Sequence, residues 1–429
     1  MKFLLLFMLL ISSAQAQLNI DRWQTPEGAK VLFTQTKGLP MLDVQLNFDA
    51  ASSRDGDQHG LATLTNTLIG TATDQLTEEQ IINGFESLGS EFSTASLKDM
   101  AIISMRSLTK KDVLRGSLSL FSDVVSRVEF QQAYLTREKK QTHQSIESAK
   151  QSPGQVASLK FNELVFAEHA YAHAKIGNKE SIDTIRLQDL QAFYRQYYVA
   201  KNLTIALVGD ISKVQAKQIA RQISHGLNGG QKAKINPVVT PLAQSQRLHI
   251  DFPSKQTHLL IGQTGVNRSH PDYHALYLGN HILGGSGLTS ILSDEIREKN
   301  GLAYSVSSRL TKMKSNGYFL IKLQTKNSQT QQAKNIVLTT LKNFVNNPID
   351  AQKLQDGKDN IIGGFALETA SNLNILTYLS IIGFYDLPLT FLNDFIAKIE
   401  KIDTKKVQKA YAKLINTSKL VVLSVGEKN

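Results

Sequence analysis

The chain has 429 residues, no cysteine, 41% hydrophobic residues and a formal net charge of +11. Without cysteine it can form neither a disulfide framework nor a thiolate metal site, and its length is sufficient for two or more hydrophobic cores. The basic residues are scattered, with no long basic run and no interleaved aromatics. The charge therefore indicates a basic surface and no nucleic-acid binding, with attraction of acidic peptides or an acidic partner subunit as the weaker alternative.

The first residues have the pattern of a secretory signal peptide. Met1 and Lys2 precede an apolar run over residues 3–11, and Ala14-Gln15-Ala16 is an A-x-A cleavage site. We expect residues 1–16 to be a signal peptide and the protein to be exported, most simply to the periplasm. The alternative is an uncleaved anchor, but the run is too short to span a bilayer and no later run approaches that length. We therefore expect no membrane anchoring.

The first half alternates strand and helix patterns. Thr77 and Gln80 have the spacing of a capping box for a helix over 78–88, and Pro153-Gly154 should end the helix before it. Strands at both ends with helices between them predict an α+β unit, in which a helical layer covers one face of a mainly antiparallel sheet. In chain order the expected elements are strands 31–34 and 43–48, helices 60–70 and 78–88, strand 101–105, helices 110–128 and 131–151, and strand 203–208.

The second half echoes the first. Residues 66–70 match residues 280–284, and residues 203–210 match residues 420–427, at offsets of 214 and 217 positions. Several ordered matches at nearly one offset predict a tandem duplication of a unit of about 200 residues. Between the halves, glycine, proline and lysine give residues 229–242 the composition of a linker. We therefore expect two homologous domains, 17–228 and 243–429.

Residues 60–71, GLATLTNTLIGT, resemble the zinc-binding helix of the pitrilysin/insulinase family of metallopeptidases, which carries an inverted H-x-x-E-H motif. The resemblance places Thr63 and Thr67 at the two histidine positions and Asn66 at the glutamate position. It places Ser145 at the third ligand position. Hydroxyl and amide groups do not replace zinc ligands or a general base. Glu147 lies on a different side of its helix and does not replace Ser145. We therefore expect no metal bound by this chain.

Five histidines offer other metal-binding patterns. Two pairs have i, i+4 spacing, but neither has the H-E-x-x-H arrangement. The pattern therefore favours surface or capping histidines, the first pair in a loop and the second in a turn that leads into a helix. These residues are His59, His169, His173, His270 and His274.

Residues 292–306 resemble the C-terminal signature of the same family, R-E-x-x-G-L-A-Y-x-V. In active members this arginine and tyrosine reach the substrate beside the zinc, and the match gives Arg297 and Tyr304. A guanidinium is a permanent forked donor for a peptide carbonyl, and a phenol can donate to a developing oxyanion. Gly301 should end the helix and lead into a strand that carries Tyr304. The alternative is a surface arginine and a half-buried strand tyrosine.

Some members of the family work as unlike pairs, in which one subunit has the zinc motif and the other only the arginine and tyrosine. The resemblance therefore implies a non-catalytic subunit of an exported heterodimeric zinc metalloendopeptidase. A zinc-motif homologue would be its partner, zinc would be on that partner, and peptides would be the substrates. The alternatives are a peptide-binding or scaffolding protein, alone or as a homodimer, and a solo peptidase with a displaced metal site. The sequence does not define the substrate, the cleavage preference or a hinge at the linker.

Overall fold

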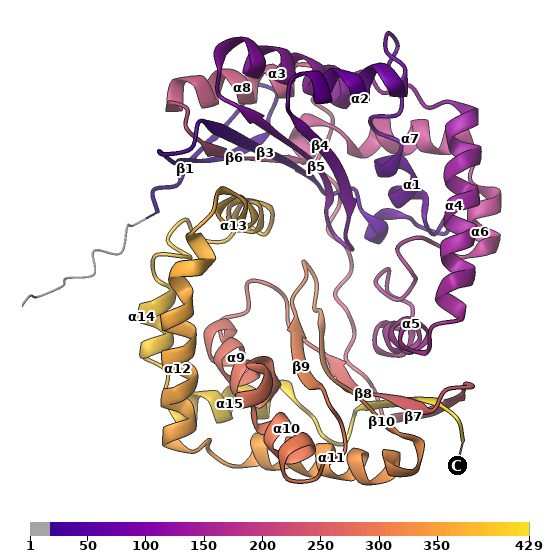
Figure 1. Ribbon diagram of the computed structural model, residues 1–429, viewed down its shortest axis with the longest axis vertical. Helices are drawn as coiled ribbons and strands as arrows, with labels where there is room; N and C mark the ends of the chain where they lie inside the picture. The colour runs from indigo at the N-terminus through magenta and orange to yellow at the C-terminus, as the bar shows by residue number, and fades with distance from the viewer. Residues whose placement is uncertain (1–17, 429) are drawn as a thin grey trace, which may run out of the picture.

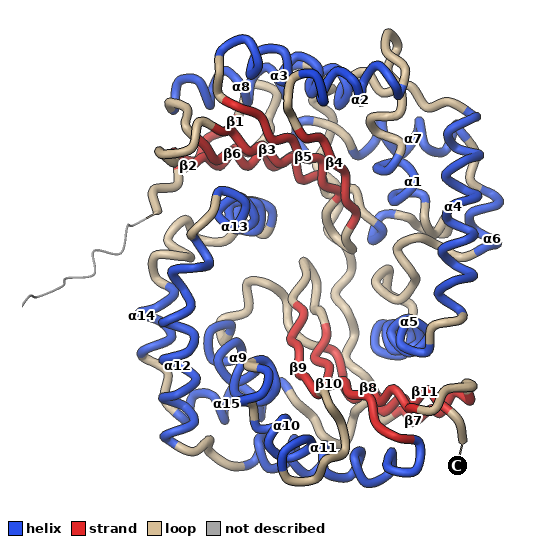
Figure 2. The backbone as a smooth tube through the Cα atoms, viewed as in Figure 1, coloured by secondary structure: helices blue, strands red, loops and turns tan. Residues whose placement is uncertain are grey.

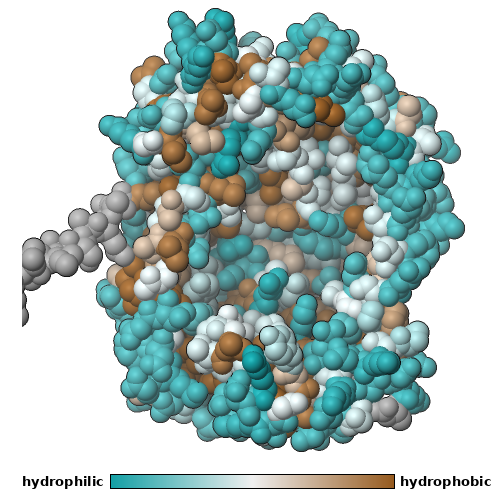
Figure 3. All heavy atoms as spheres, viewed as in Figure 1, coloured by the Kyte–Doolittle hydropathy of each residue, from teal (hydrophilic) through white to brown (hydrophobic). Residues whose placement is uncertain are grey.

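The computed structural model describes residues 18–428, and the predicted signal peptide lies outside them. The chain folds into two halves, each with one sheet and an outer layer of helices (Figure 1). The connection between the halves is a long segment without helix or strand (Figure 2). A space-filling view shows a hollow between the two halves (Figure 3).

The first half contains a six-stranded sheet with the order β1-β2-β6-β3-β5-β4. Its strands are β1 (Asp21–Gln24), β2 (Lys30–Gln35), β3 (Met41–Phe48), β4 (Glu91–Ser96), β5 (Ala101–Leu108) and β6 (Leu203–Gly209). Its helices are α1 (Leu61–Thr67), α2 (Glu78–Ser87), α3 (Lys111–Ser126), α4 (Gln132–Lys150), α5 (Pro153–Phe166), α6 (Lys179–Thr184), α7 (Leu187–Tyr197) and α8 (Lys213–His225), with short 3-10 turns at 52–54 and 200–202.

The second half contains a five-stranded sheet with the order β7-β11-β8-β10-β9. Its strands are β7 (Gln246–Asp251), β8 (Gln256–Thr264), β9 (Val306–Thr311), β10 (Tyr318–Lys326) and β11 (Val421–Gly426). Its α-helices are α9 (Tyr273–Asn280), α10 (Ile291–Ser293), α11 (Thr330–Asn346), α12 (Ala351–Phe365), α13 (Asn372–Phe384), α14 (Phe395–Glu400) and α15 (Thr404–Leu414). Two π-helical turns lie at His281–Gly285 and Asp294–Glu298, and 3-10 turns lie at 287–289, 327–329 and 366–369.

The two sheets have the same topology, which confirms the predicted α+β tandem duplication. In the first sheet β2 and β6 are parallel, and β6-β3-β5-β4 are successively antiparallel. In the second sheet β7 and β11 are parallel, and β11-β8-β10-β9 are successively antiparallel. Among the strands of residues 18–428, only β1 has no counterpart in the second sheet. In chain order, β6 is the last strand of the first sheet and β7 is the first strand of the second. We therefore propose 17–228 and 243–429 as the two domains and 229–242 as their linker.

Local signals place most element ends correctly. Thr77 accepts a hydrogen bond from the Gln80 backbone and the Gln80 side chain accepts one from Thr77, so the predicted capping box starts α2. The expectation for Pro153 needs a correction. The preceding helix α4 already ends at Lys150, and Pro153 is the first residue of the next helix, where its missing N–H costs no hydrogen bond.

Each half contributes one helix that packs on the sheet of the other half, and we call these two helices the lent helices. Helix α13 of the second half packs on β2, β3 and β6, and helix α5 of the first half packs on β8 and β11. A methyl group at Gly383 on α13 would lie 2.5 Å from Leu32 on β2, so glycine permits this close approach. The sequence predicted a helical layer on one face only. Because of the lent helix, six of the eight residues of β3 are buried, although its sequence alternates.

A polar cluster joins the halves at the tip of the β9–β10 hairpin. The Lys314 ammonium pairs with Asp49, and the Lys314 backbone N–H donates to the Asp99 carboxylate over 2.8 Å. Arg54 pairs with Asp49 at 2.7 Å and also donates to the linker carbonyl of Lys234. Burial raises the pKa of Asp99. The linker is therefore fastened to the first domain, and these contacts would have to break for the halves to open.

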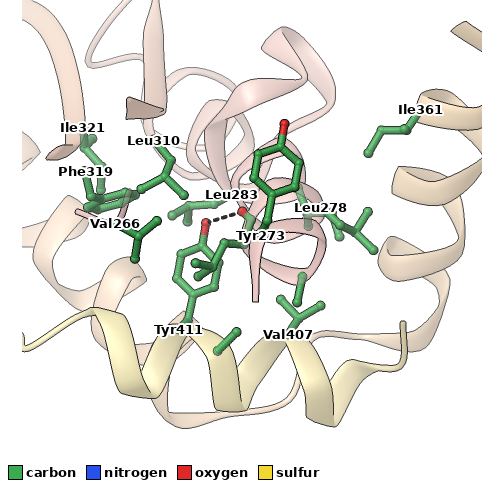
Figure 4. Packing of buried hydrophobic residues seen from close by; sticks show 14 of the residues in the cluster. Val266, Tyr273, Leu278, Leu283, Leu310, Phe319, Ile321, Ile361, Val407 and Tyr411 are labelled. Carbon is green, nitrogen blue, oxygen red and sulfur yellow. Dashed lines mark hydrogen bonds between the residues drawn. The ribbon is translucent and has the colours of Figure 1, made fainter. Parts of the chain in front are cut away.

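Large hydrophobic cores hold the helices on their sheets. In the second half Tyr411 of α15 is fully buried and donates to the Leu276 carbonyl of α9 over 3.2 Å (Figure 4). This contact fixes α9, which is the counterpart of α1 in the first half. In the described part of the chain, no helix combines the length and the hydropathy needed to cross a bilayer.

Candidate functional site

Helix α1, which carries the degenerate motif, is held rigidly at its start. Gly60 precedes it with a φ of 98°, and a Cβ at this position would lie 2.7 Å from the Ile176 carbonyl oxygen. Glycine is therefore required here by both conformation and space. The buried carboxylate of Asp55 accepts hydrogen bonds of 2.8 Å from the N–H groups of Gly60 and Ala62. The chain thus keeps the frame of a functional helix even though its motif residues have changed.

Asn66, at the position of the general base, is a buried structural clamp. Its amide nitrogen donates to the carbonyl oxygen of Ala95 on β4 over 2.9 Å and to that of Ile102 on β5 over 3.3 Å. Its amide oxygen accepts from the Tyr198 hydroxyl over 3.0 Å. Only 1% of Asn66 is exposed. The side chain is therefore saturated with hydrogen bonds and holds no group that could activate water.

The second domain shows the same clamp. Asn280 on α9 is the repeat equivalent of Asn66, and its amide donates to the Ser308 carbonyl of β9 over 3.2 Å. The Ser308 hydroxyl in turn contacts the Asn280 amide oxygen at 3.0 Å. Strand β9 occupies the same edge position in its sheet as β4 does in the first sheet. In both domains, therefore, an asparagine ties the helix to the edge of the sheet.

The three ligand positions do not fit zinc. The Thr63 hydroxyl donates to the Lys175 carbonyl over 2.6 Å, and the Ser145 hydroxyl donates to the Gln141 carbonyl within its own helix. Thr67 is exposed. None of these oxygens is a nitrogen, thiolate or carboxylate donor, and two are engaged in backbone bonds. Glu147 is exposed and pairs with Lys150 at 2.8 Å. Across residues 18–428, no group of three or more His, Asp or Glu side chains converges to hold a metal.

The histidines near α1 differ from the surface or capping histidines that the sequence indicated. His173 pairs with Asp55 at 3.0 Å, and only 11% of its side chain is exposed. Its ring stacks on His59 with centroids 4.0 Å apart and planes 2° apart. Burial, followed by the neighbouring His173, lowers the pKa of His59. The pair is a structural brace between the α1 entry and the 167–178 loop, and its long-range contacts left no signal in the sequence.

Lysines near the degenerate motif were also missed by the sequence analysis. Lys175 donates to the Ser96 carbonyl over 2.9 Å, next to the Asn66 clamp. Lys98 donates to the His173 carbonyl, and burial lowers the pKa of Lys98 to about 8. The ammonium groups of Lys98 and Lys175, bonded to backbone carbonyls, therefore fill the space between α1 and the end of β4.

In the second domain, His270 matches its prediction and His274 does not. The His270 ring accepts from the Asp272 N–H over 3.2 Å, within the turn that leads into α9. His274 is the second residue of α9 and packs against Phe391 and Phe395, and its Nε2 is buried without a hydrogen-bond partner within the described residues. Burial lowers the pKa of His274 to about 4. In the loop pair, His169 contacts the Pro237 carbonyl at 3.0 Å.

We expect His274 to make the second domain acid-sensitive. In the unfolded chain a histidine has a pKa near 6.5, so between about pH 6.5 and 4 the unfolded state binds the extra proton and folding loses stability as pH falls. The nearby Lys312, Lys398 and Lys406 act in the same direction, and Asp394 opposes them.

Guanidinium unfolding of the His274→Phe variant at pH 7 and pH 4.5 tests this expectation. Phenylalanine suits the aromatic surroundings and cannot titrate, so the variant should lose less stability over this interval than the wild type. His225→Phe, at a histidine whose side chain is 82% exposed, is the control. An equal pH dependence of the His274→Phe variant and the wild type would contradict the assignment.

Arg297 and Tyr304 lie together on the surface of the second domain. The Arg297 guanidinium stands over the Tyr304 ring, 4.9 Å from its centroid, and Nε contacts Glu298 at 3.3 Å. Tyr304 is 85% exposed and Arg297 is 31% exposed at its side chain. A cation over an aromatic face is attracted by about 0.5–1 kcal/mol at such an exposed site. The two side chains therefore orient each other and remain accessible.

Gly301 produces the turn that brings the pair together. It has a φ of 59°, and the N–H groups of Gly301 and Leu302 bond to the carbonyls of Arg297 and Ile296 at 2.9 Å. One expectation is corrected, since Tyr304 lies in the loop before β9 and not on a strand. The pair and the four degenerate positions lie in different halves (Figure 1), and no hydrogen bond or ion pair joins them within the described chain.

The fold and the site define a class: a duplicated α+β protein with the frame of a metallopeptidase and a motif that does not fit zinc. Comparisons agree with this class. The family model described as "Insulinase (Peptidase family M16)" matches residues 30–178, and the model described as "Peptidase M16 inactive domain" matches residues 184–361.

Similar proteins cover nearly the whole chain. A crystal structure of a peptidase M16 inactive domain from Pseudomonas fluorescens has 39% identity and a TM-score of 0.93, covering 96% of this chain and 98% of that one. The non-peptidase homolog YmxG of Helicobacter pylori is 26% identical, over 94% of this chain and 91% of the relative. The uncharacterized zinc protease YmxG of Bacillus subtilis is 20% identical, over 82% of this chain and 85% of the relative. The chain belongs to the insulinase peptidase family M16, as an inactive member that lacks the zinc motif.

Proposed function

We propose that this protein is the non-catalytic subunit of an exported, heterodimeric zinc metalloendopeptidase. A homologous partner subunit with an intact motif would supply the zinc and the general base. This chain would supply Arg297 and Tyr304 as groups that bind the peptide substrate, together with half of the chamber wall. The predicted signal peptide would direct it to the periplasm.

The observation that carries the proposal is the contrast between the two domains. Asn66 in the first domain has become a saturated structural clamp, so a catalytic role of this domain is lost. The Arg297–Tyr304 pair in the second domain is exposed, mutually oriented and free of any structural hydrogen bond at its phenol within the described residues. A structural role would be better served by a buried or fully bonded pair, and binding is favoured by an exposed one.

The chemistry of the pair suits a peptide. The guanidinium presents donors that remain charged at any physiological pH and can hold a carbonyl or carboxylate of the substrate. The Tyr304 hydroxyl is a neutral donor that can stabilise charge developing on a carbonyl oxygen. Both groups act by binding and orienting the substrate, and neither performs hydrolysis alone.

Peptide hydrolysis tests the proposal directly. We expect no activity from this protein alone, little or none from its zinc-motif homologue of the same organism alone, and clear activity from the two mixed. An inactive mixture, or an active homologue that gains nothing from this chain, would overturn the proposal. Zinc analysis of this chain alone is the parallel measurement, and stoichiometric zinc would revive a solo peptidase.

A second candidate is a peptide-binding or scaffolding protein without catalysis, possibly homodimeric. The H. pylori relative named as a non-peptidase homolog favours it. In this case the isolated protein binds peptides, Arg297→Ala weakens binding, and no mixture hydrolyses them.

A further inference from the structure

Strand β7 leaves one edge of the second sheet unpaired. It is bonded on one side to β11, with the Gln246 N–H donating to the Leu420 carbonyl over 2.9 Å and the Phe252 N–H to the Gly426 carbonyl over 3.1 Å. In a parallel ladder alternate residues bond to one neighbour, so the backbone groups of Arg247, His249 and Asp251 face the other side. There, within the described chain, no further strand pairs with them. An open edge of this kind is a template for an added strand.

The equivalent edge in the first domain is covered. Strand β2 is the repeat counterpart of β7. On β2, Lys30 lies opposite Thr204 of β6, and on β7, Gln246 lies opposite Val421 of β11. Gln246 is the counterpart of Lys30 at an offset of 216 and Val421 that of Thr204 at an offset of 217, so the two strands have the same register. Strand β1 pairs with the outer side of β2 in antiparallel fashion. The internal repeat therefore shows what kind of element fits the free side of β7: a short antiparallel strand.

A groove of about 830 Å³ lies beside this open edge. It is bounded by α4, α5, the 172–178 loop and Ile250 on β7. Its apolar lining includes Ile146, Val156, Leu159, Ile176 and Ile250. Leu159 on α5 is 36% exposed there. The groove thus lies on the inner face of the sheet, against the helix that the first half lends.

The first domain also shows which side chain fills such a groove. Ile250 on β7 corresponds to Thr34 on β2. Ile20, the residue just before β1, lies next to Thr34, and the Thr34 hydroxyl donates to the Asn19 carbonyl over 3.1 Å. Ile20 is buried in the core that includes Leu376 and Ile382 of the lent helix α13. A strand added to β7 would place its counterpart of Ile20 beside Ile250, where it would cover the exposed apolar side chains of α5.

The charges around the groove favour an acidic occupant. Lys175 lines the groove, and its ammonium donates to the Ser96 carbonyl but forms no ion pair within the described residues. Lys150 and Lys160, in contrast, are paired with Glu147 and Glu163. On the open edge, the exposed Arg247 also has no ion pair within the described residues. Arg247 is the counterpart of Val31 on β2, which lies opposite Trp23 of β1, so an added strand would place one of its residues opposite Arg247. With a net charge of +11, a second copy of this chain is the less complementary occupant.

We propose that β7 and this groove form a docking site for an extended segment of a partner protein, in which apolar residues alternate with acidic ones. The segment adds to the sheet as an antiparallel strand on β7. Its inward side chains fill the groove over Leu159 and Ile250, and an acidic residue faces Arg247. This site is independent of the Arg297–Tyr304 pair and of any zinc on a partner.

Fluorescence anisotropy with a labelled heptapeptide tests the site on the full protein. The probe has the sequence of residues 18–24 with two changes. Arg22→Leu gives an apolar side chain on the side of the strand that faces the groove, and Trp23→Glu gives an acid at the position opposite Arg247. We expect saturable binding. A matched peptide with the further changes Leu18→Ser and Ile20→Ser should bind at least tenfold more weakly, because it lacks the side chains that fill the groove. A peptide with Trp23→Lys instead of Trp23→Glu should also bind more weakly.

Two protein variants test the location. His249→Pro removes an outward N–H and leaves the backbone bonds to β11 intact, and it should weaken binding roughly tenfold. Both His249→Pro and His249→Ala remove the 2.9 Å contact of the ring with Ser424 on β11, so His249→Ala is the control for that loss and should not weaken binding. Leu159→Glu places a charge in the groove and should also weaken binding. If circular dichroism shows that His249→Pro is misfolded, the effect of Leu159→Glu on peptide binding tests the location of the site. Equal binding of the apolar and serine peptides, or binding unchanged by both variants, would overturn the site. Self-association of this chain that His249→Pro abolishes would overturn the choice of partner.

Discussion

Replacing Arg297 by alanine is expected to lower kcat/KM for peptide hydrolysis by the mixed subunits roughly 100-fold, the loss typical for one well-placed donor to a transition state. Arg297→Lys should recover only part of this activity, because an ammonium lacks the planar fork and stacks less well on Tyr304. Tyr304→Phe keeps the ring beneath the guanidinium and removes only the hydroxyl. It therefore separates donation by the phenol from the stacking of the pair.

The control is Arg221→Ala, at an exposed arginine on α8 in the outer helical layer of the first domain. It removes the same charge and should leave hydrolysis unchanged. Melting temperature and subunit association are measured for all variants, because Arg297 lies on the surface and its loss should alter neither. Equal activity of the Arg297→Ala and Arg221→Ala mixtures would show that the pair does not contact substrate.

The second large effect is on stability. Asn66→Ala should lower the free energy of unfolding of the first domain by about 3 kcal/mol, since it leaves the Tyr198 hydroxyl and the carbonyls of Ala95 and Ile102 buried without partners. Urea unfolding followed by circular dichroism measures this change. Asn66→Asp should destabilise at least as much, because it keeps an acceptor for Tyr198 but places a buried carboxylate against the carbonyl oxygens of Ala95 and Ile102.

The matched control is Asn83→Ala, at an exposed asparagine within α2. Removing its side chain breaks no buried hydrogen bond, so the stability should change by about 0.5 kcal/mol or less. Asn280→Ala, at the equivalent clamp of the second domain, should destabilise that domain instead. If Asn66→Ala were as stable as Asn83→Ala, the clamp would contribute nothing, and the loss of the base would need another explanation.

Much of the fold could be predicted from the sequence, because the signals for it are local. The period of the residues located the helices α3 and α4, and Thr77 with Gln80 defined the start of α2 through side chains three residues apart. The repeat was visible because homologous positions keep their order along the chain, and the shared sheet topology confirms it. Thr63, Asn66 and Thr67 excluded the usual zinc motif by residue type alone.

The rest required the tertiary structure, because it depends on groups that lie far apart along the chain. The lent helices α5 and α13 cover the sheet of the other half, and nothing in the sequence of β3 shows that a distant helix will bury its second face. The sequence favoured surface or capping histidines, but His173 pairs with a buried carboxylate and stacks on a second ring, and His274 packs against aromatic rings with its Nε2 buried.

Residue types and their spacing thus determined, by themselves, the duplication, the family frame and the absence of the zinc motif. Only the tertiary structure decided what Asn66 does instead, which side chains meet Arg297, and which sheet edge stays open. The physical reason is that periodicity, capping and residue chemistry act over a few residues, whereas burial, hydrogen-bond saturation and strand pairing are set by the long-range packing of both halves.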